Sequence, residues 1–145
     1  MKEKMLVKTA MQAAKNAFNP RPDSHGVGAA VLTKSGMVFP GVNIQSAISG
    51  LGTCAERAAV YNAVSNGHCN ISCLAVYFPS KKFFNPCGAC LQLLSEFSQV
   101  SASDIRIIEV NSEGKTRSTS LRKILPHSLG PVDLNWPIEK FRKRA

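Results

Sequence analysis

The sequence predicts an α/β fold in which helices pack on the faces of a β-sheet, and three observations lead to this prediction. Apolar segments of strand length alternate with helical segments of ten or more residues. Two of the apolar segments are separated only by a short turn at Ser35-Gly36, which is typical of an antiparallel hairpin. The chain has 145 residues and is 44% hydrophobic, so we expect one domain, 1–145, with a basic C-terminal tail from about residue 136.

The first half of the chain predicts a helix followed by a hairpin. Apolar residues at helical spacing predict a helix over residues 3–17. Two prolines together with Asn, Asp, Ser and Gly predict an irregular loop over residues 19–26. The apolar segments 27–33 and 37–44 are then the two strands of the hairpin.

The second half predicts further helices and strands in alternation. Strong helix formers over residues 53–66 predict a helix with Thr53 as its N-cap. The continuous apolar run 71–78 is typical of a buried central strand. A helix over residues 87–97 follows Asn85-Pro86, which we expect to be its cap and first-turn proline. The remaining segments are predicted as a strand at 105–110, a turn at 111–114, a short strand at 115–119, a short helix at 120–125 and a tail with Trp136 and Phe141.

Composition narrows the class of protein. The net charge is +9, but much of the excess Lys and Arg lies near the two ends of the chain, without the aromatic residues that stack on bases. We therefore expect solvated ends and no nucleic-acid partner. No segment has the apolar length of a membrane helix or the pattern of a signal peptide, so we expect a cytoplasmic protein without membrane contact. Five cysteines, an odd number, argue against a disulfide framework and leave reduced thiols or metal ligands.

Three of the cysteines occur in two short motifs, each at the start of a predicted helix. Cys54 begins one helix, and Cys87 and Cys90 form a Cys-X-X-Cys motif at the start of the other. Thiolates in this arrangement can converge on one zinc ion (Zn²⁺) and leave its fourth tetrahedral position for water, as catalytic zinc sites do. The sequence therefore predicts an open, catalytic zinc site.

Two charged residues next to Cys54 extend this site. Glu56 lies in the first turn of the same predicted helix, where its carboxylate can accept and deliver protons without ligating the metal. Three thiolates overcompensate the charge of one zinc ion and weaken it as a Lewis acid. The two helix N-termini and a hydrogen bond from Arg57 to a cysteine sulfur would offset that excess of negative charge.

Other interpretations of these residues remain open at the level of the sequence. Thr53 and Glu56 also match a capping box, and Cys-X-X-Cys alone could be a redox pair. A structural zinc site normally has a fourth Cys or His nearby, yet His25, His68 and His127 all lie outside both motifs. The alternative of another class is a non-catalytic, zinc-stabilised module that binds RNA or protein through its basic ends.

The segments TCAER at 53–57 and PCGAC at 86–90 resemble the signature of the cytidine deaminase family in its three-cysteine zinc form. VGAAVLTKSG, GVN and LPHSLGPVDL are similar to that family's segments in the same order. The resemblance implies a three-layer α/β/α sandwich around a five-stranded mixed sheet, one zinc ion per subunit, and a homotetramer whose neighbouring subunits complete the active sites. It also implies hydrolytic deamination of cytidine and deoxycytidine, with release of ammonia, in pyrimidine salvage.

The same resemblance implies roles for individual residues. Glu56 would contact the pyrimidine N3 and move protons, and the backbone of Ala55 would help to hold the base. Asn43 would hydrogen-bond the ribose hydroxyl. Gln45 lies two residues after Asn43, which puts both side chains on one face of a strand and favours a role in the same pocket.

The chain departs from the family's pattern at the substrate pocket. Gln45 replaces a Glu that grips the 3′-hydroxyl, and His25 replaces an aromatic residue that packs on the base; His25 could stack in its place or be an ordinary loop residue. Leu129 replaces a second aromatic residue, which a neighbouring subunit contributes. Arg21 and Asp23 stand where the family has a stretch with Tyr and Pro. These departures leave a modified cytosine nucleoside, a nucleotide or a blasticidin-like antibiotic as alternative substrates.

Overall fold

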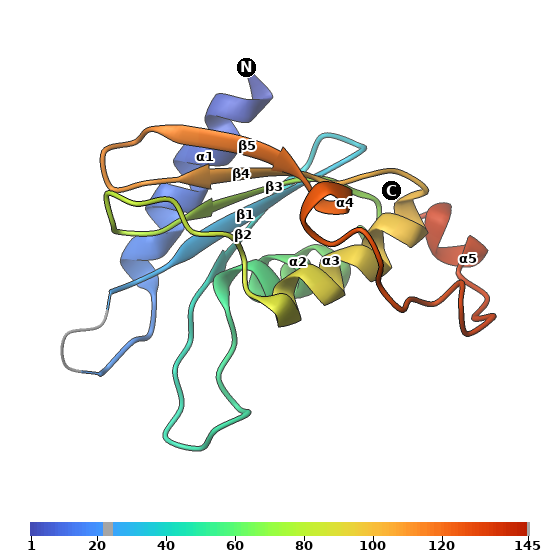
Figure 1. Ribbon diagram of the computed structural model, residues 1–145, viewed down its shortest axis with the longest axis horizontal. Helices are drawn as coiled ribbons and strands as arrows, with labels where there is room; N and C mark the ends of the chain where they lie inside the picture. Colours follow the sequence, from blue (N-terminus) through green and yellow to red (C-terminus); the bar gives the residue numbers. More distant parts are fainter. Residues whose placement is uncertain (22–24, 145) are drawn as a thin grey trace.

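A computed structural model describes residues 1–21 and 25–144 and shows a five-stranded sheet with helices on both faces (Figure 1). The strand order is β2-β1-β3-β4-β5. β3 and β4 pair in parallel, and the other three neighbouring pairs are antiparallel. This is the α/β/α sandwich around a mixed sheet that the family resemblance implied. The strands are β1 (Gly28–Thr33), β2 (Val38–Val42), β3 (Ile71–Tyr77), β4 (Arg106–Val110) and β5 (Thr116–Ser120).

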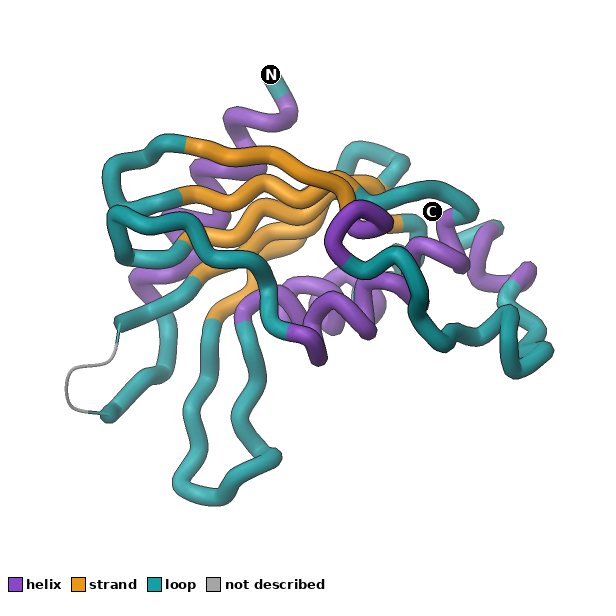
Figure 2. The backbone as a smooth tube through the Cα atoms, viewed as in Figure 1, coloured by secondary structure: helices purple, strands orange, loops and turns teal. Residues whose placement is uncertain are grey.

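One long helix covers one face of the sheet, and two cover the other (Figure 1). α1 (Lys2–Ala13) buries Leu6 and Ala10 against the sheet and continues into a 3₁₀ turn at Ala14–Asn16. α2 (Ala55–Ser65) and α3 (Gly88–Ser101) lie side by side on the opposite face (Figure 2). Two short helices, α4 (Leu121–Ile124) and α5 (Glu139–Arg142), belong to the C-terminal part of the chain.

β3 separates the two layers of the core, as its continuous apolar run predicted. It lies in the middle of the sheet, between β1 and β4. Leu74 and Val76 belong to the core cluster under α2 and α3, whereas Cys73 and Ala75 belong to the cluster under α1. Because successive side chains of a strand point to opposite faces, an apolar residue is required at each of these positions.

The hairpin of β1 and β2 is confirmed, with its turn where the sequence placed it. Gly36 has a φ of +90°, a backbone conformation that glycine adopts without steric cost. Its N–H donates to the carbonyl of Thr33 at 2.9 Å, and the N–H of Thr33 donates to Met37 at the same distance. The turn therefore fixes the register in which β2 leads toward α2.

The ends of several elements differ from the sequence predictions. α3 continues to Ser101 rather than to residue 97, because Ser98, Val100 and Ser101 are buried, and it ends before Ala102 in the left-handed conformation with a φ of 50°. The opening helix loses its regular α-helical form after Ala13. The predicted loop 19–26 includes residues 22–24, Asp23 among them, which lie outside the described residues. Residues 19–21 and 25–26 of this loop are neither helix nor strand.

Both predicted helix caps at the cysteine motifs were wrong. The N-cap of α2 is Cys54, not Thr53, and the N-cap of α3 is Cys87, not Asn85; Pro86 precedes the helix and does not lie in its first turn. Thr53 instead pairs its backbone with Ile44 through hydrogen bonds of 2.9 and 3.0 Å, so the chain is still extended at that residue. No side-chain hydrogen bond caps α2, which excludes the capping box of Thr53 and Glu56. The consequence is that Cys54 and Cys87 immediately precede the first residues of their helices, Ala55 and Gly88.

Within the described residues, none of the helices combines the length and the apolar character that a membrane span requires.

Gly41 in β2 sets how closely the sheet approaches the first turns of α2. A Cβ at this position would overlap backbone atoms of Ala55 and Ala59. Gly41→Ala is therefore expected to lower the free energy of unfolding by about 1–3 kcal/mol, as overpacking of a core does. Urea unfolding of the zinc-loaded protein measures the change. Thr116→Ala, at an exposed position of β5, is the matched control and is expected to stay within about 0.5 kcal/mol of the wild type. Equal unfolding midpoints for Gly41→Ala and the wild type would contradict this account.

Candidate metal centre

Three cysteine sulfurs converge at the N-terminal ends of α2 and α3. The Sγ atoms of Cys54 and Cys87 are 3.8 Å apart, those of Cys87 and Cys90 are 3.4 Å apart, and all three lie within 4.8 Å of one another. All three cysteines are free thiols. Among the described residues, they form the one group of Cys, His, Asp or Glu side chains with the geometry of a metal site.

The spacing of the sulfurs matches a zinc ion. Zinc–thiolate bonds of about 2.3 Å in a tetrahedral arrangement place two sulfurs roughly 3.8 Å apart. Cys90 is buried, Cys54 is partly buried and Cys87 is exposed, so the cluster opens toward solvent on one side. Three thiolates would hold a zinc ion and leave one coordination position for water or a substrate, which is the pattern of a catalytic zinc site.

Cys87 is held in place by contacts between its preceding loop and the β4–β5 hairpin. The side-chain amide of Asn111 donates to the carbonyl of Lys81 at 3.0 Å, and the N–H of Ser112 donates to Ser80 at 2.9 Å. The guanidinium of Arg117 lies 5.1 Å from the centre of the Phe83 ring. The loop is therefore attached to the edge of the sheet before it enters α3.

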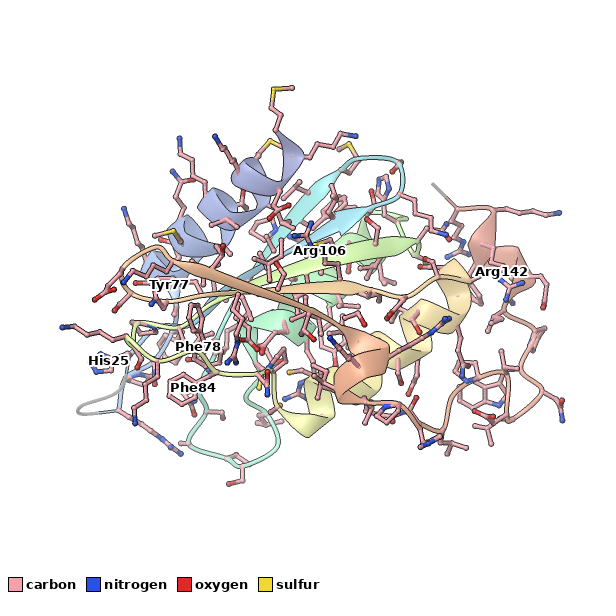
Figure 3. All side chains as sticks on the ribbon, turned by 45° about the horizontal axis from the view of Figure 1, so that its top comes forward. His25, Tyr77, Phe78, Phe84, Arg106 and Arg142 are labelled. Atoms are coloured by element: carbon pink, nitrogen blue, oxygen red, sulfur yellow. The ribbon has the colours of Figure 1, made fainter. Side chains whose placement is uncertain are left out.

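The same loop is attached to the sheet by an aromatic pair. The rings of Phe78 and Phe84 are 5.4 Å apart between centroids and tilted by 45° (Figure 3). Aromatic pairs in such geometries add to the stability that burial gives. Both ends of the loop that leads to Cys87 are thus fixed.

Burial and charge shift the pKa values of the three thiols in different directions. Burial raises the pKa of Cys90, and the nearby carboxylate of Glu56 raises it further. Burial also raises the pKa of Cys54, although its hydrogen bond from Arg57 opposes the shift. For Cys87, burial acts in the same direction, but hydrogen bonds from the backbone and side chain of Cys90 and from Cys54 outweigh it and lower the pKa. Zinc binding to this cluster must therefore displace thiol protons.

Arg57 supplies positive charge directly to the sulfurs. Its Nη2 donates to the Sγ of Cys54 at 3.8 Å. This hydrogen bond, together with the negative charge of the thiolates, raises the pKa of the guanidinium above its ordinary value. Arg57 therefore remains a cation that offsets the excess negative charge of a three-thiolate site.

Glu56 lies in the first turn of α2 and is 3% exposed. Burial raises the pKa of its carboxyl group above the ordinary value, and hydrogen bonds from its own backbone N–H and from Cys90 oppose that shift only in part. A carboxyl group with a raised pKa exchanges protons closer to neutral pH, as a general acid and base must. Glu56 combines this property with a position beside the thiol cluster.

A cavity of 250 Å³ adjoins the cluster at Cys54 and Arg57. Asn43 and Gln45, from the segment after β2, line it, and Asn43 is 9% exposed. Arg21 also lines the cavity, although the sequence interpretation noted it only as a departure from a pattern. The one signal of it in the sequence was a charged residue in a proline-rich loop, because Arg21 lines the same cavity as residues 43–45 although the two segments are distant in sequence.

Ala55, His25 and Leu129, which the sequence analysis also discussed for the substrate pocket, are not among the described residues that line this cavity. Ala55 is the first residue of α2 and is fully buried, so its backbone lies directly beside Cys54. His25 is exposed near one edge of the molecule (Figure 3) and is not among the described residues that line the cavity. Leu129 is 61% exposed, and its carbonyl accepts a hydrogen bond from Gln92 on α3.

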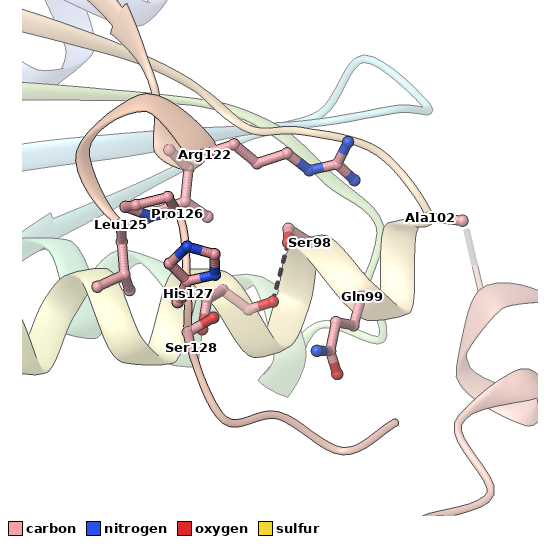
Figure 4. A pocket seen from close by; sticks show the side chains of 10 residues that line it. Ser98, Gln99, Ala102, Arg122, Leu125, Pro126, His127 and Ser128 are labelled. Carbon is pink, nitrogen blue, oxygen red and sulfur yellow. Dashed lines mark hydrogen bonds between the residues drawn. The ribbon is translucent and has the colours of Figure 1, made fainter. Parts of the chain in front are cut away.

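A larger cavity, of 660 Å³, lies between α3 and the segment around His127 (Figure 4). Arg122, Gln99 and His127 line it with serine and apolar side chains, and no thiol or carboxylate is among its described lining residues. It therefore lacks the metal ligands and the acid/base group that the smaller cavity adjoins.

The chain matches a known protein family. Residues 1–103 match the family described as "Cytidine and deoxycytidylate deaminase zinc-binding region". The chain is 36% identical to a cytidine deaminase of Halalkalibacterium halodurans, over 93% of this chain and 99% of that protein. It is 33% identical to a blasticidin-S deaminase of Bacillus cereus, over 72% of this chain and 76% of that protein.

A solved structure is similar as well. The cytidine deaminase of Burkholderia pseudomallei superposes with a TM-score of 0.80 and 32% sequence identity, covering 89% of this chain and all of that one. The similarity therefore extends from the zinc motifs to the arrangement of the whole sheet.

Zinc binding is expected to require each of the three converging thiols. Cys54→Ser, Cys87→Ser and Cys90→Ser, made one at a time, are expected to lose most of the bound zinc, because two thiolates and water hold the ion far less tightly than three thiolates. Elemental analysis of the purified proteins measures it. The matched control is Cys69→Ala, which removes a buried thiol outside the cluster and is expected to retain zinc. Full zinc content in any of the three serine variants would contradict the assignment of that ligand.

Proposed function

The chain belongs to the family of zinc-binding cytidine and deoxycytidylate deaminases, and on this basis we propose that it hydrolyses cytidine and deoxycytidine to uridine and deoxyuridine with release of ammonia. The observation that carries the proposal is the position of Glu56, a buried carboxyl group beside three thiols that have the spacing of zinc ligands. The enzyme is a hydrolase of a cyclic amidine C–N bond. Its cofactor is one zinc ion, held by Cys54, Cys87 and Cys90.

The reaction needs a nucleophile, a proton carrier and a leaving group. Zinc supplies a Lewis acid that makes water nucleophilic near neutral pH. Glu56 takes a proton from the attacking water and delivers it to N3 of the pyrimidine as the C4–O bond forms. Glu56 then takes the proton of the new C4 hydroxyl group and gives it to the amino group, so that the C4–N bond breaks, ammonia leaves and a C4 carbonyl remains. The raised pKa of Glu56 supports this role, because the same group must accept and donate protons within one cycle.

The residues around the thiols orient the substrate in this proposal. The backbone of Ala55, at the first position of α2, holds the base beside Cys54. Asn43 and Gln45 line the adjoining cavity and bind the sugar hydroxyls, and Arg57 offsets the charge of the sulfurs. His25 is exposed and is not among the described residues that line the cavity, so a role in stacking on the base stays a prediction.

The enzyme is proposed to act as a homotetramer with shared active sites, in the cytoplasm and in pyrimidine salvage. The loop between β2 and α2 projects from the body of the molecule (Figure 1) and exposes Ile48 by 65% and Leu51 by 68%. Apolar side chains this exposed on a projecting loop are typical of a subunit interface. The loop also forms one wall of the cavity at Cys54, so a neighbouring subunit seated on it would complete the site.

Glu56→Gln tests the proposed chemistry. The amide cannot exchange a proton at working pH, so kcat for cytidine is expected to fall by between about 10² and 10⁴-fold, while zinc content stays that of the wild type. Ammonia release and elemental analysis measure the two quantities. Glu113→Gln, in the exposed turn between β4 and β5, is the matched control and is expected to leave both unchanged.

A non-catalytic zinc module would give a different result. The wild type would then bind zinc without releasing ammonia from any cytosine derivative, and Glu56→Gln would alter nothing measurable. That outcome would refute the proposed function.

Leu51→Asp tests the shared active site. A carboxylate on the projecting loop is expected to disrupt subunit contacts, so both the mass in light scattering and the specific activity on cytidine are expected to fall, the latter by about tenfold or more. Met37→Asp, at an exposed apolar position of the β1–β2 turn, is the matched control and is expected to keep both. A monomeric wild type with full activity would contradict the proposed assembly.

A further inference from the structure

A cavity of 390 Å³ lies beside the C-terminal end of α3, and four cations line it. Its volume falls in the range of small-molecule sites, roughly 300–1,000 Å³. Its described lining residues include no Asp or Glu. The cations come from the turn between β1 and β2 and from the C-terminal part of the chain: Lys34, Arg142, Lys143 and Arg144.

Two of these cations are held in place by neutral groups at the end of α3. The Nζ of Lys34 donates to the carbonyl of Ser101, the last residue of the helix. The Nε of Arg142 donates to the carbonyl of Val100 at 3.1 Å, and its Nη2 donates to that of Gln99 at 3.2 Å. The C-terminal end of a helix carries only about half an elementary negative charge, so most of the two positive charges remains.

The segment that carries the other two cations is attached to the body of the molecule. The sequence predicted a solvated basic end, and the side chains of residues 142–144 are indeed exposed. Their backbone is nevertheless fixed, because the side-chain amide of Asn70 donates to the carbonyls of Arg142 at 2.9 Å and Arg144 at 2.5 Å. The carbonyl of Asn70 accepts a hydrogen bond of 2.8 Å from the N–H of Lys34. Asn70 thus joins the two segments that supply the cations.

The positive charge of this cavity is not neutralised within the described residues. The ion pairs of that part of the chain join other side chains and include none of the four cations. Ala145 lies outside the described residues, and a carboxylate there would add one negative charge against four positive ones. At least three positive charges are therefore in excess.

Ser101 adds a polar group to the same cavity. It lines the cavity and is 3% exposed, and its buried Oγ has no hydrogen-bond partner among the described residues. A buried hydroxyl group without a partner costs free energy. Rotation about its Cα–Cβ bond can turn this hydroxyl group toward oxygen atoms of a ligand.

The charge of the cavity matches two adjacent phosphates. One phosphate ester carries about −1.5 to −2 at pH 7, so three or four positive charges match two phosphates better than one. Guanidinium groups also bind phosphate oxygens through paired N–H donors. A nucleic-acid strand is less favoured, because the ring of Phe141 already lies against the cations of Lys140 and Arg144 and is not free to stack on bases.

We propose that this cavity binds a small molecule with two adjacent phosphates, such as free diphosphate or a nucleoside diphosphate. The site is separate from the thiol cluster. Ser101 is the last of the 14 residues of α3, so about 20 Å of helix separates it from Cys87. Arg142 and Phe84, which belongs to the loop before Cys87, lie toward opposite ends of the molecule (Figure 3).

Isothermal titration calorimetry of the zinc-loaded wild type with pyrophosphate and with ADP tests the proposal. At least one of the two is expected to bind, and the tighter one identifies the source of the phosphates as free diphosphate or a nucleotide. The double variant Lys143→Gln and Arg144→Gln is expected to raise the Kd about tenfold or more, because it removes two charge-assisted contacts. In the wild type the Kd is expected to rise with added salt.

A matched double variant separates a local effect from a general one. Lys4→Gln and Lys123→Gln together remove an equal charge from exposed positions that are not among the described lining residues of the cavity. This variant is expected to keep the Kd of the wild type. Both double variants are expected to turn over cytidine as the wild type does, because neither changes a residue of the thiol cluster or of the cavity beside it.

Three results would overturn the inference. The first is a Kd above about 1 mM for both compounds with the wild type. The second is a Kd that does not change in the Lys143→Gln and Arg144→Gln variant, or that rises equally in the matched variant. The third is tighter binding of an oligoadenylate than of either small compound, which would assign the cations to RNA. A wild type that does not deaminate cytidine would refute the deaminase function and leave this inference standing.

Discussion

The convergence of three sulfurs at the N-terminal ends of two helices is the constraint on which the rest of the structure depends. It requires α2 and α3 to lie side by side on one face of the sheet. Gly41 permits the close approach of β2 to the first turns of α2, and contacts from Asn111 and Arg117 fix the loop that leads to Cys87. A change of an ångström or two in any of these contacts would separate the sulfurs beyond the spacing of zinc ligands.

The same convergence sets the electrostatics of the site. Cys54 and Cys87 are N-caps, so the free N–H groups and the positive ends of two helix dipoles lie near the sulfurs and stabilise thiolates. Burial acts in the opposite sense on Cys90 and on Glu56 and raises both pKa values. Burial also raises the pKa of Cys54, and the hydrogen bond from Arg57 opposes that shift only in part. The site thus combines ligands that are charged when metal is bound with a carboxyl group that exchanges its proton readily.

The cavity beside the thiols is built from different kinds of segment than the thiol cluster. The zinc ligands come from helix ends, which regular backbone hydrogen bonding makes rigid, whereas Asn43, Gln45 and Arg21 come from irregular segments. These segments are joined by the bridges from Ile44 to Phe18 and to Thr53. Such short pairings fix the backbone with few hydrogen bonds, so residues on them can change the substrate without disturbing the metal site. If these residues bind the substrate as proposed, the cavity wall could vary between relatives while the metal ligands stay the same; two relatives that this chain resembles are named for cytidine and for blasticidin S.

The sequence by itself determined the α/β class, the hairpin, the central strand and the three thiols with Glu56. Each of these depends on the spacing of residues close together in the chain, such as the three-residue step from Cys87 to Cys90, which the first turn of a helix converts directly into proximity. Tertiary structure decided the helix caps, because Thr53 pairs with Ile44 instead of opening α2. It also decided that Arg21 lines the cavity while His25 remains exposed. The physical reason is that these positions follow from hydrogen bonds between segments distant in sequence, and neither periodicity nor local propensity encodes such pairings.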